Sequence, residues 1–154
     1  MRYECAVSPI VRPANQNDAS DWLRMRRSLW PTSSSDHEFE IAAFFGVGIR
    51  GIDAVFVAEL DGKLIGFAEL SIRPWAEGCR SSNVAYLEGW YVDRDDRRAG
   101  VGALLICEAE RWARSRGCSE FASDAEADNA DSREAHAGVG FEEVGLVRCF
   151  RKGL

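Results

Sequence analysis

The stretch Tyr86-Leu87-Glu88-Gly89-Trp90-Tyr91-Val92, followed after a charged turn by Arg97-Arg98-Ala99-Gly100-Val101-Gly102, decides the fold of this chain. It predicts a strand that runs through a glycine-containing turn directly into a helix. The first N–H groups of such a helix have no internal partner, and the helix dipole adds positive character there. The glycines let the backbone approach a phosphate closely, and Arg97 and Arg98 add positive charge. The turn is therefore expected to bind an anion, most simply a pyrophosphate.

Two well-known nucleotide motifs do not fit this turn. The Walker pattern requires Gly-Lys followed by Ser or Thr, which is missing here. The dinucleotide pattern fails because Leu105 occupies the place of the third glycine, and because the strand is not the first of a βαβ unit. A tight turn with ordinary helix packing is the alternative interpretation of the two glycines.

Hydrophobic periodicity predicts alternating helices and strands on both sides of this segment. We expect, in chain order, a strand at 10–12, helices at about 18–29 and 36–45, strands at 54–58, 64–68 and 84–92, a helix at about 101–116, a strand at 121–123, a helix at 132–139, and a final pair of strands from 140 to about 151. This order indicates one α/β domain, residues 1–154, with a mixed sheet.

The composition is that of an ordinary globular protein, with 154 residues, 46% hydrophobic and 29% charged. Lysine and arginine number 19 against 25 acidic residues, which gives a net charge of −6. That balance argues against nucleic acid as a partner, since phosphate binding requires a basic surface, and it leaves room for a cationic substrate.

The cysteines and the N-terminal segment indicate the cellular compartment and whether a metal site is expected. The five cysteines share no metal-ligand spacing and there are only two histidines, so no metal site is expected. The segment Met1–Ala6 has no apolar region typical of a signal peptide, and no run reaches the roughly 18 apolar residues that a membrane span needs. We therefore expect a reduced cytoplasmic protein that does not bind a membrane.

The motif Arg97-x-x-Gly100-x-Gly102 after the Tyr91-Val92 strand end resembles the acetyl-CoA signature of the GNAT superfamily of N-acetyltransferases. Asn129, then His136 seven residues on, then Gly140-Phe141 resemble its second motif. The resemblance is closer to one branch, the aminoglycoside 6′-N-acetyltransferases, and extends from about residue 10 to the end. Its six matching pieces are Leu29-Trp30-Pro31, Ala68-Glu69-Leu70-Ser71-Ile72-Arg73, Leu87-Glu88-Gly89, Glu110-Arg111-Trp112-Ala113, Phe121-Ala122-Ser123-Asp124 and Gly140-Phe141-Glu142-Glu143.

The resemblance implies a GNAT fold, in which a mixed central sheet with flanking helices is splayed at the acetyl-CoA site. The strand at 88–92 would separate from its neighbouring strand, and the pantetheine arm of acetyl-CoA would fill the gap. Gly89 suits this, since a glycine inside a strand often marks a bulge or a close approach. A backbone N–H there would polarise the thioester carbonyl. The implied cofactor-binding residues are Trp90, Tyr91 and Val92 for pantetheine, Arg97, Arg98, Gly100, Val101, Gly102 and Ala103 for the pyrophosphate, and Asn129 for the pantetheine arm.

Two residues are candidates for catalysis. A substrate ammonium must lose a proton before it can attack, and a carboxylate at the split of the sheet can accept that proton. Glu88 is therefore the candidate for amine recognition and for the general base. The alternative is a strand glutamate paired with an arginine. His136 stands where many relatives carry a tyrosine that protonates the departing thiolate, and the alternative is that it packs under the cofactor.

By residue-by-residue match, the acceptor site would consist of Trp30, Trp75, Glu88 and Asp124. Carboxylates suit the ammonium groups of a polycationic sugar, and flat aromatic faces suit its rings. Trp30 as a core residue at a helix end, and Asp124 as a loop cap, are the structural alternatives. The assignment of Trp75 is affected by a one-residue deletion in its loop.

The sequence departs from the branch at two places. Gly145 stands where close relatives carry an acidic residue, so one acceptor carboxylate is missing or is replaced by Glu143 or Glu126. The N-terminal segment Met1–Pro9 also extends beyond the usual start of the branch.

The sequence and the resemblance together indicate an enzyme that transfers acetyl from acetyl-CoA directly to the 6′-amine of an aminoglycoside and so confers resistance. A homodimer is expected from the resemblance alone. A GNAT enzyme acting on a polyamine, a small metabolite or a protein amino group is the first alternative. A non-catalytic acyl-CoA-binding sensor is the second.

Overall fold

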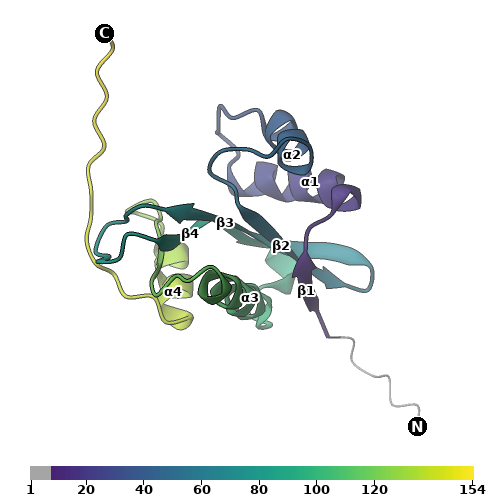
Figure 1. The fold of residues 1–154 in the computed structure, drawn as a ribbon. Helices are drawn as coiled ribbons and strands as arrows, with labels where there is room; N and C mark the ends of the chain where they lie inside the picture. Colours follow the sequence, from purple (N-terminus) through teal and green to yellow (C-terminus); the bar gives the residue numbers. More distant parts are fainter. Residues whose placement is uncertain (1–7) are drawn as a thin grey trace.

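A mixed five-stranded sheet with the strand order β1-β2-β3-β4-β5 forms the centre of the molecule (Figure 1). The structure is a computed structural model and describes residues 8–154. The first four strands pair antiparallel and the last pairs parallel to its neighbour, so the predicted mixed sheet is confirmed. The strands are β1 (Ile10–Pro13), β2 (Ala54–Leu60), β3 (Lys63–Arg73), β4 (Val84–Val92) and β5 (Phe121–Ser123).

Helices cover both faces of this sheet (Figure 1). On one face α1 (Ala19–Leu29) and α2 (His37–Phe45) pack on a core that includes Trp22 and Phe67. On the other face α3 (Val101–Ser115) packs on a core that includes Leu70, and α4 (Ala130–Gly138) lies beside it. Short 3₁₀ turns, η1 (Gln16–Asp18) and η2 (Arg94–Asp96), precede α1 and α3. Successive side chains of a strand point to opposite faces, which is why the central strands contribute to both cores.

The sheet opens between β4 and β5, as expected. The parallel pairing covers only Ala85 to Leu87 on β4, and β4 continues for five residues without a partner strand on that side. A bulge lies at the same place, because Glu69 of β3 faces Gly89 and Leu70 faces Leu87. Glu88 is therefore the extra residue of a β-bulge, at the point where the two strands separate.

The predicted final pair of strands, from 140 to about 151, is wrong for this structure. Residues 141–154 form neither helix nor strand. Phe141 still packs against Phe121 and His136, and the end of the chain leads away from the domain (Figure 1). The segment 141–151 has strand-like composition, but a strand also requires a neighbour that completes its hydrogen bonds. No segment of the described chain provides that neighbour beyond β5.

Some expectations concern residues outside the described range. Cys5 and most of the Met1–Pro9 extension lie there, while Cys79, Cys107, Cys118 and Cys149 are free thiols. Within residues 8–154, no helix is long and apolar enough to cross a membrane. The same part of the chain contains no cluster of three or more histidine, cysteine, aspartate or glutamate side chains suited to a metal ion.

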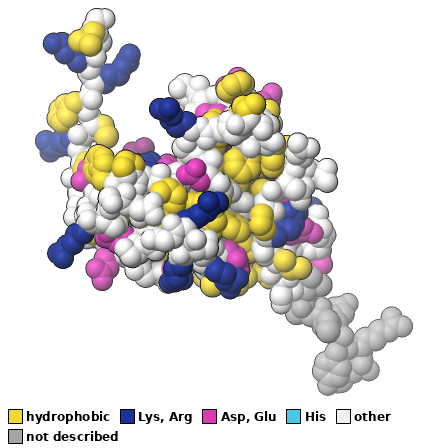
Figure 2. Space-filling model, in the orientation of Figure 1, with side chains coloured by type: hydrophobic (Ala, Val, Ile, Leu, Met, Phe, Trp, Pro, Cys, Tyr) yellow, Lys and Arg dark blue, Asp and Glu magenta, His cyan; other side chains and the backbone are white. Residues whose placement is uncertain are grey.

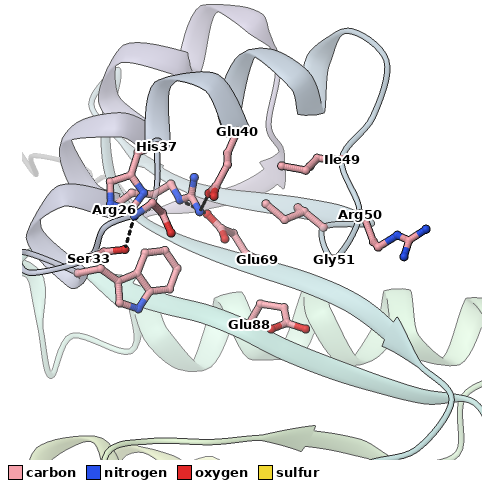
Figure 3. Close-up of a pocket in the computed structure, with 12 residues that line it drawn as sticks. Arg26, Ser33, His37, Glu40, Ile49, Arg50, Gly51, Glu69 and Glu88 are labelled. Atoms are coloured by element: carbon pink, nitrogen blue, oxygen red, sulfur yellow. Dashed lines mark hydrogen bonds and ion pairs between the residues drawn. The ribbon is translucent and has the colours of Figure 1, made fainter. Parts of the chain in front are cut away.

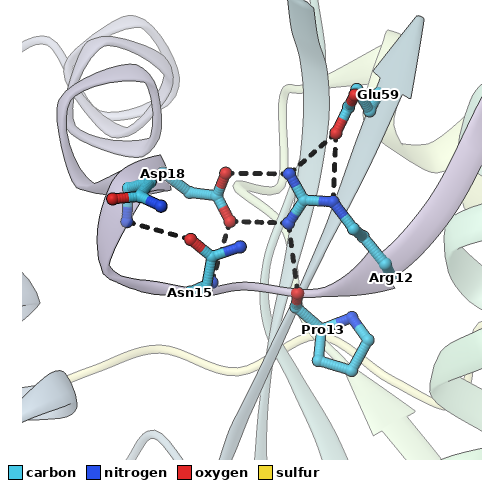
Figure 4. A network of polar contacts seen from close by, with 6 residues as sticks. Arg12, Pro13, Asn15, Asp18 and Glu59 are labelled. Carbon is cyan, nitrogen blue, oxygen red and sulfur yellow. Dashed lines mark hydrogen bonds and ion pairs between the residues drawn. The ribbon is translucent and has the colours of Figure 1, made fainter. Parts of the chain in front are cut away.

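A charged network joins the first strand to the first helix (Figure 4). Arg12 of β1 donates to both oxygens of Asp18, at 2.7 and 2.9 Å, and to Glu59 of β2, at 2.7 and 3.0 Å. Asp18 also accepts from the backbone N–H of Asn15 and so completes a capping box before α1. Asp18 is buried, and its hydrogen bonds to Arg12 lower the pKa of its carboxyl group.

We expect Asp18→Asn to destabilise the fold by about 2 kcal/mol at neutral pH, because Arg12 loses a buried, charged partner. The pKa of Asp18 is lower in the folded state than its ordinary value of 3.8, so its stabilisation is complete above that value and disappears as the pH falls through the folded pKa. Urea unfolding of both proteins between pH 7 and pH 3 measures the difference. Glu38→Gln, which breaks an exposed pair with Arg27, is the control and should cost less than about 0.5 kcal/mol. An equal cost for both variants, or a difference that grows at low pH, would contradict this account.

Candidate active site

The turn before α3 has the geometry of an anion-binding site. Gly100 is the N-cap residue with a φ of 83°, a conformation that favours glycine, and it offers no side-chain acceptor to the helix N–H groups. A Cβ atom at Gly102 would lie 3.0 Å from the Trp90 ring, so a side chain there would crowd β4. The guanidinium of Arg97 donates to the carbonyl oxygen of Val92 at 2.8 Å. The turn is thereby attached to the end of β4, with open N–H groups that fit a pyrophosphate.

The edge of β4 beyond Leu87 provides the second part of this site. Trp90, Tyr91 and Val92 belong to the portion of β4 that has no strand on the β5 side. The Nε1 atom of Trp90 is buried and makes no hydrogen bond within the described chain. The structure therefore brings the residues expected at the pantetheine arm next to those expected at the pyrophosphate. Asn129 lies apart as the N-cap of α4, where its side chain accepts from the backbone N–H of Ser132 at 3.0 Å.

His136 of α4 lies against the Trp90 ring, with the two ring centroids 5.3 Å apart. Its Nδ1 is 2.7 Å from the carbonyl oxygen of Ser132, and its Nε2 is 2.8 Å from the hydroxyl of Ser123. Because a carbonyl only accepts hydrogen bonds, the Nδ1 atom of His136 is the donor in the contact with Ser132. Both ring nitrogens of His136 thus have partners within the protein.

A pocket of about 350 Å³ lies on the opposite face of the sheet, between α1, α2, the 49–52 loop and strands β3 and β4 (Figure 3). Its wall includes the ring of Trp30. A Cβ atom at Gly89 would lie 2.7 Å from Cη2 of Trp30, so glycine at the bulge is what allows this ring to cover β4. The ionisable side chains that line the pocket are Arg26, His37, Glu40, Arg50, Glu69 and Glu88.

Glu88, at the edge of this pocket, is held by hydrogen bonds from β3. Arg73 donates to its two oxygens at 2.9 and 2.7 Å, and the Ser71 hydroxyl donates at 2.5 Å. The Arg73 guanidinium lies 3.4 Å from the ring centroid of Tyr86, and the Tyr86 hydroxyl donates to Asp124 at 2.6 Å. The hydrogen bond to Glu88 raises the pKa of Arg73, and burial raises the pKa of Tyr86. Arg73 and Tyr86 therefore connect Glu88 to Asp124, and the ion pair between Glu88 and an arginine, which the sequence analysis gave as the alternative, is present.

The other predicted acceptor residues do not all line this pocket. Trp75 is 64% exposed on the loop after β3, and it does not belong to the pocket wall. Gly145 has open space around it, and Glu143 is paired with Arg133 at 3.0 Å. The side chain of Glu126 is exposed. Of the predicted set, the structure brings Trp30 and Glu88 together in the pocket and links Asp124 to them through Tyr86 and Arg73.

A second charged cluster forms the inner wall of the pocket, and sequence reasoning missed it. Glu69 of β3 is fully buried, and its Oε1 accepts from Nε1 of Trp22 at 2.8 Å and lies 3.0 Å from Nε of Arg26. Arg26 also donates to Glu40 of α2 at 2.6 Å. Burial raises the pKa of Glu69 to about 7, although Arg26 and Trp22 act in the opposite direction.

The sequence contains one signal for these missed residues. Glu69, Ser71 and Arg73 alternate along a strand, so the period of two predicts that they share a face. Polar residues at three such positions are unusual for a central strand and indicate a site on that face. Arg26 and Glu40 gave no comparable signal, since they come from two separate helices.

Comparisons with known proteins bear on the family and the fold of the chain. Residues 18–141 match the model of the acetyltransferase (GNAT) family. The chain is 53% identical to an aminoglycoside N(6′)-acetyltransferase type 1 from Klebsiella aerogenes, over 96% of this chain and 98% of that protein. It superposes on the aminoglycoside N-acetyltransferase AAC(6′)-Iy in complex with CoA, with a TM-score of 0.89, 35% identity and coverage of 98% and 99% of the two chains. A structure of AAC(6′)-Iy with the bisubstrate analogue CoA-S-monomethyl-acetylneamine gives a TM-score of 0.87, with 36% identity and coverage of 96% and 99%.

Proposed function

The chain belongs to the acetyltransferase (GNAT) family, and from this premise we propose that it transfers an acetyl group from acetyl-CoA to the 6′-amine of an aminoglycoside. One observation carries the proposal. On one side of the segment from Glu88 to Val92 lie the anion-binding turn and the open strand edge. On the other side lies the pocket that contains Glu69 and Glu88. A thioester bound along that edge and an amine bound in that pocket would meet at the bulge.

On the cofactor side, the N–H groups of Val101, Gly102 and Ala103 and the charges of Arg97 and Arg98 would hold the pyrophosphate of acetyl-CoA. The main chain of Trp90, Tyr91 and Val92 would bind the pantetheine amides, and Asn129 would add a contact to the arm. Acetyl-CoA supplies the activated acetyl group as a thioester. A backbone N–H at the bulge would polarise its carbonyl.

On the acceptor side, Glu88 and Asp124 would bind ammonium groups, and Trp30 would provide a flat apolar wall. The pocket wall also contains buried polar nitrogens. Nη1 of Arg26 and Nδ1 of His37 make no hydrogen bond within the described chain. The Arg26 nitrogen is a donor and complements a hydroxyl oxygen of an amino sugar, as the carboxylates complement its amines. This mixture supports an aminoglycoside over a polyamine, which has no hydroxyl groups to offer.

For His136, we propose a positioning role. Both of its ring nitrogens are already held within the protein, Nδ1 by the Ser132 carbonyl and Nε2 by the Ser123 hydroxyl. Packing on Trp90 and holding the Ser123 hydroxyl are the functions that its contacts support.

Aminoglycoside resistance would follow from this reaction because acetylation removes a positive charge that the drug uses for binding. The reaction is placed in the cytoplasm, where acetyl-CoA is available, and in a single domain formed by residues 1–154. Trp75 would contact the outer part of the acceptor from its exposed loop.

We further propose that the protein acts as a homodimer in which the C-terminal segment of each copy contacts the other copy. After Phe141, the side chains of Val144, Leu146, Val147 and Phe150 are between 63% and 91% exposed. Figure 2 shows this segment projecting from the domain with hydrophobic side chains uncovered. Within residues 8–154, no strand pairs with the outer edge of β5. An unpaired edge strand, together with an apolar, strand-like segment, favours pairing between copies.

The dimer proposal predicts a mass of two chains in light scattering coupled to size-exclusion chromatography. Replacing both Leu146 and Phe150 by Asp should give a folded monomer, because burial of these side chains between copies would then be unfavourable. Val47→Asp is the matched control, since Val47 is 97% exposed in the loop after α2, and it should leave the mass unchanged. A monomeric parent protein, or a dimer that survives both aspartates, would refute the proposal.

The proposed reaction is tested by thiol release from acetyl-CoA with a matched pair of aminoglycosides that carry either a 6′-amine or a 6′-hydroxyl. We expect release with the amine and less than about 1% of that rate with the hydroxyl, since a neutral hydroxyl lacks the charge that Glu88 binds. Equal release with both compounds would contradict the regiochemistry. If neither compound causes thiol release but a polyamine or a protein amine does, the acceptor belongs to another class.

Glu88→Gln should lower kcat/KM for the 6′-amine by about a hundredfold or more, because the site loses the charge that binds the ammonium group. The Kd of acetyl-CoA, measured by calorimetry, should stay within twofold, since the turn and the strand edge are unchanged. Turnover at the parent rate would remove Glu88 from the mechanism.

A further inference from the structure

Two of the three carboxylates that line the pocket, Glu69 and Glu88, have unlike surroundings. Both oxygens of Glu88 accept hydrogen bonds from Arg73, and one also accepts from Ser71. The contacts of Glu69 to Trp22 and Arg26 are made by Oε1, whereas Oε2 makes none within the described part of the chain. Two carboxylates in one site take different roles when their environments differ in this way.

The register of the sheet places Glu69 beside the proposed point of reaction. Glu69 is paired with Gly89 across the β3–β4 ladder, next to the bulge that carries Glu88. Glu88 directly precedes Gly89 in the bulge, so the two glutamates start from neighbouring positions of β3 and β4. Both glutamates line the same pocket, and Figure 3 shows Glu69 directed into it from the side of Arg26 and Glu40. An amine bound at Glu88 is therefore within reach of Glu69, directly or through one water molecule.

Ionisable side chains from α1, α2, β4 and the loop before β2 surround Glu69. Arg26 faces it from α1, Glu40 and His37 from α2, and Glu88 from β4, while Arg50 lines the pocket from the loop before β2. Burial is the largest influence and raises the pKa of Glu69 to about 7, with Glu40 and Glu88 acting in the same direction. A base is most efficient when its pKa lies near the working pH.

We propose that Glu69 is the final proton acceptor of the reaction, while Glu88 binds the ammonium group. This inference rests on the proposed acetyl transfer. An N–H bond of the ammonium breaks, its electron pair stays on nitrogen for attack on the thioester carbonyl, and an O–H bond forms on Oε2 of Glu69. The C–S bond then breaks, and the departing CoA thiolate takes the second proton of the nitrogen, directly or through water, and leaves as the thiol. Glu69 gives the proton to water after the acetylated product has left the pocket.

The test is the pH dependence of kcat/KM for a 6′-amine between pH 5.5 and 9. The parent enzyme should lose activity below a pH near 7, as Glu69 becomes protonated. Glu69→Gln should lower kcat about a hundredfold, remove this acid limb and leave the Kd of acetyl-CoA within twofold. A role that is only structural would change KM or the melting temperature but keep the acid limb, and that outcome overturns the proposal.

A second variant tests the same proposal without removing the buried carboxylate. Glu40→Gln deletes a negative charge that raises the pKa of Glu69, so the acid limb should move to lower pH. Glu38→Gln on the same helix removes an exposed carboxylate outside the pocket, and it should leave the limb in place. If the Glu40→Gln enzyme acetylates the amine but its acid limb stays at the parent pH, the role of Glu69 is refuted and the proposed function is not. An enzyme that releases no thiol with any 6′-amine refutes the proposed function, and this inference with it.

Discussion

β5 pairs with β4 only as far as Leu87, and the rest of this structure depends on that constraint. A strand whose N–H and C=O groups are left open must bind something else along that edge or bind water. The anion-binding turn at Gly100 lies at the end of the same strand, so a ligand with amides and a diphosphate satisfies both requirements. The bulge at Glu88 then directs a carboxylate to the opposite face at the same point.

That opposite face is polar because the strand β3 carries Glu69, Ser71 and Arg73 in alternation beside the bulge. The side chains are compensated internally, Glu69 by Arg26 and Trp22, and Glu88 by Arg73. A cationic substrate therefore meets carboxylates whose orientation is already fixed before it binds. Such prior orientation reduces the cost of arranging charges during the reaction.

Local patterns in the sequence predicted most of this fold. The strand, turn and helix around Glu88 and Gly100 are contiguous, and the periods of two and 3.6 identify the remaining central elements. The cluster of Arg26, Glu40 and Glu69 was missed because its members come from α1, α2 and β3 and meet only after folding. The final strands were predicted wrongly for a related reason, since composition shows that a segment can be a strand but not whether a partner strand is present.

A crystal structure with an unreactive acetyl-CoA analogue and a 6′-amino aminoglycoside tests the central claim most directly. We predict that the pantetheine arm lies between β4 and β5, with hydrogen bonds to the main chain of Trp90 and Val92. The 6′-nitrogen should lie about 3 Å from a carboxylate oxygen of Glu88, in the pocket that also contains Glu69. An analogue bound away from the open edge of β4, or an amine bound on the α4 face of the sheet, would contradict the account.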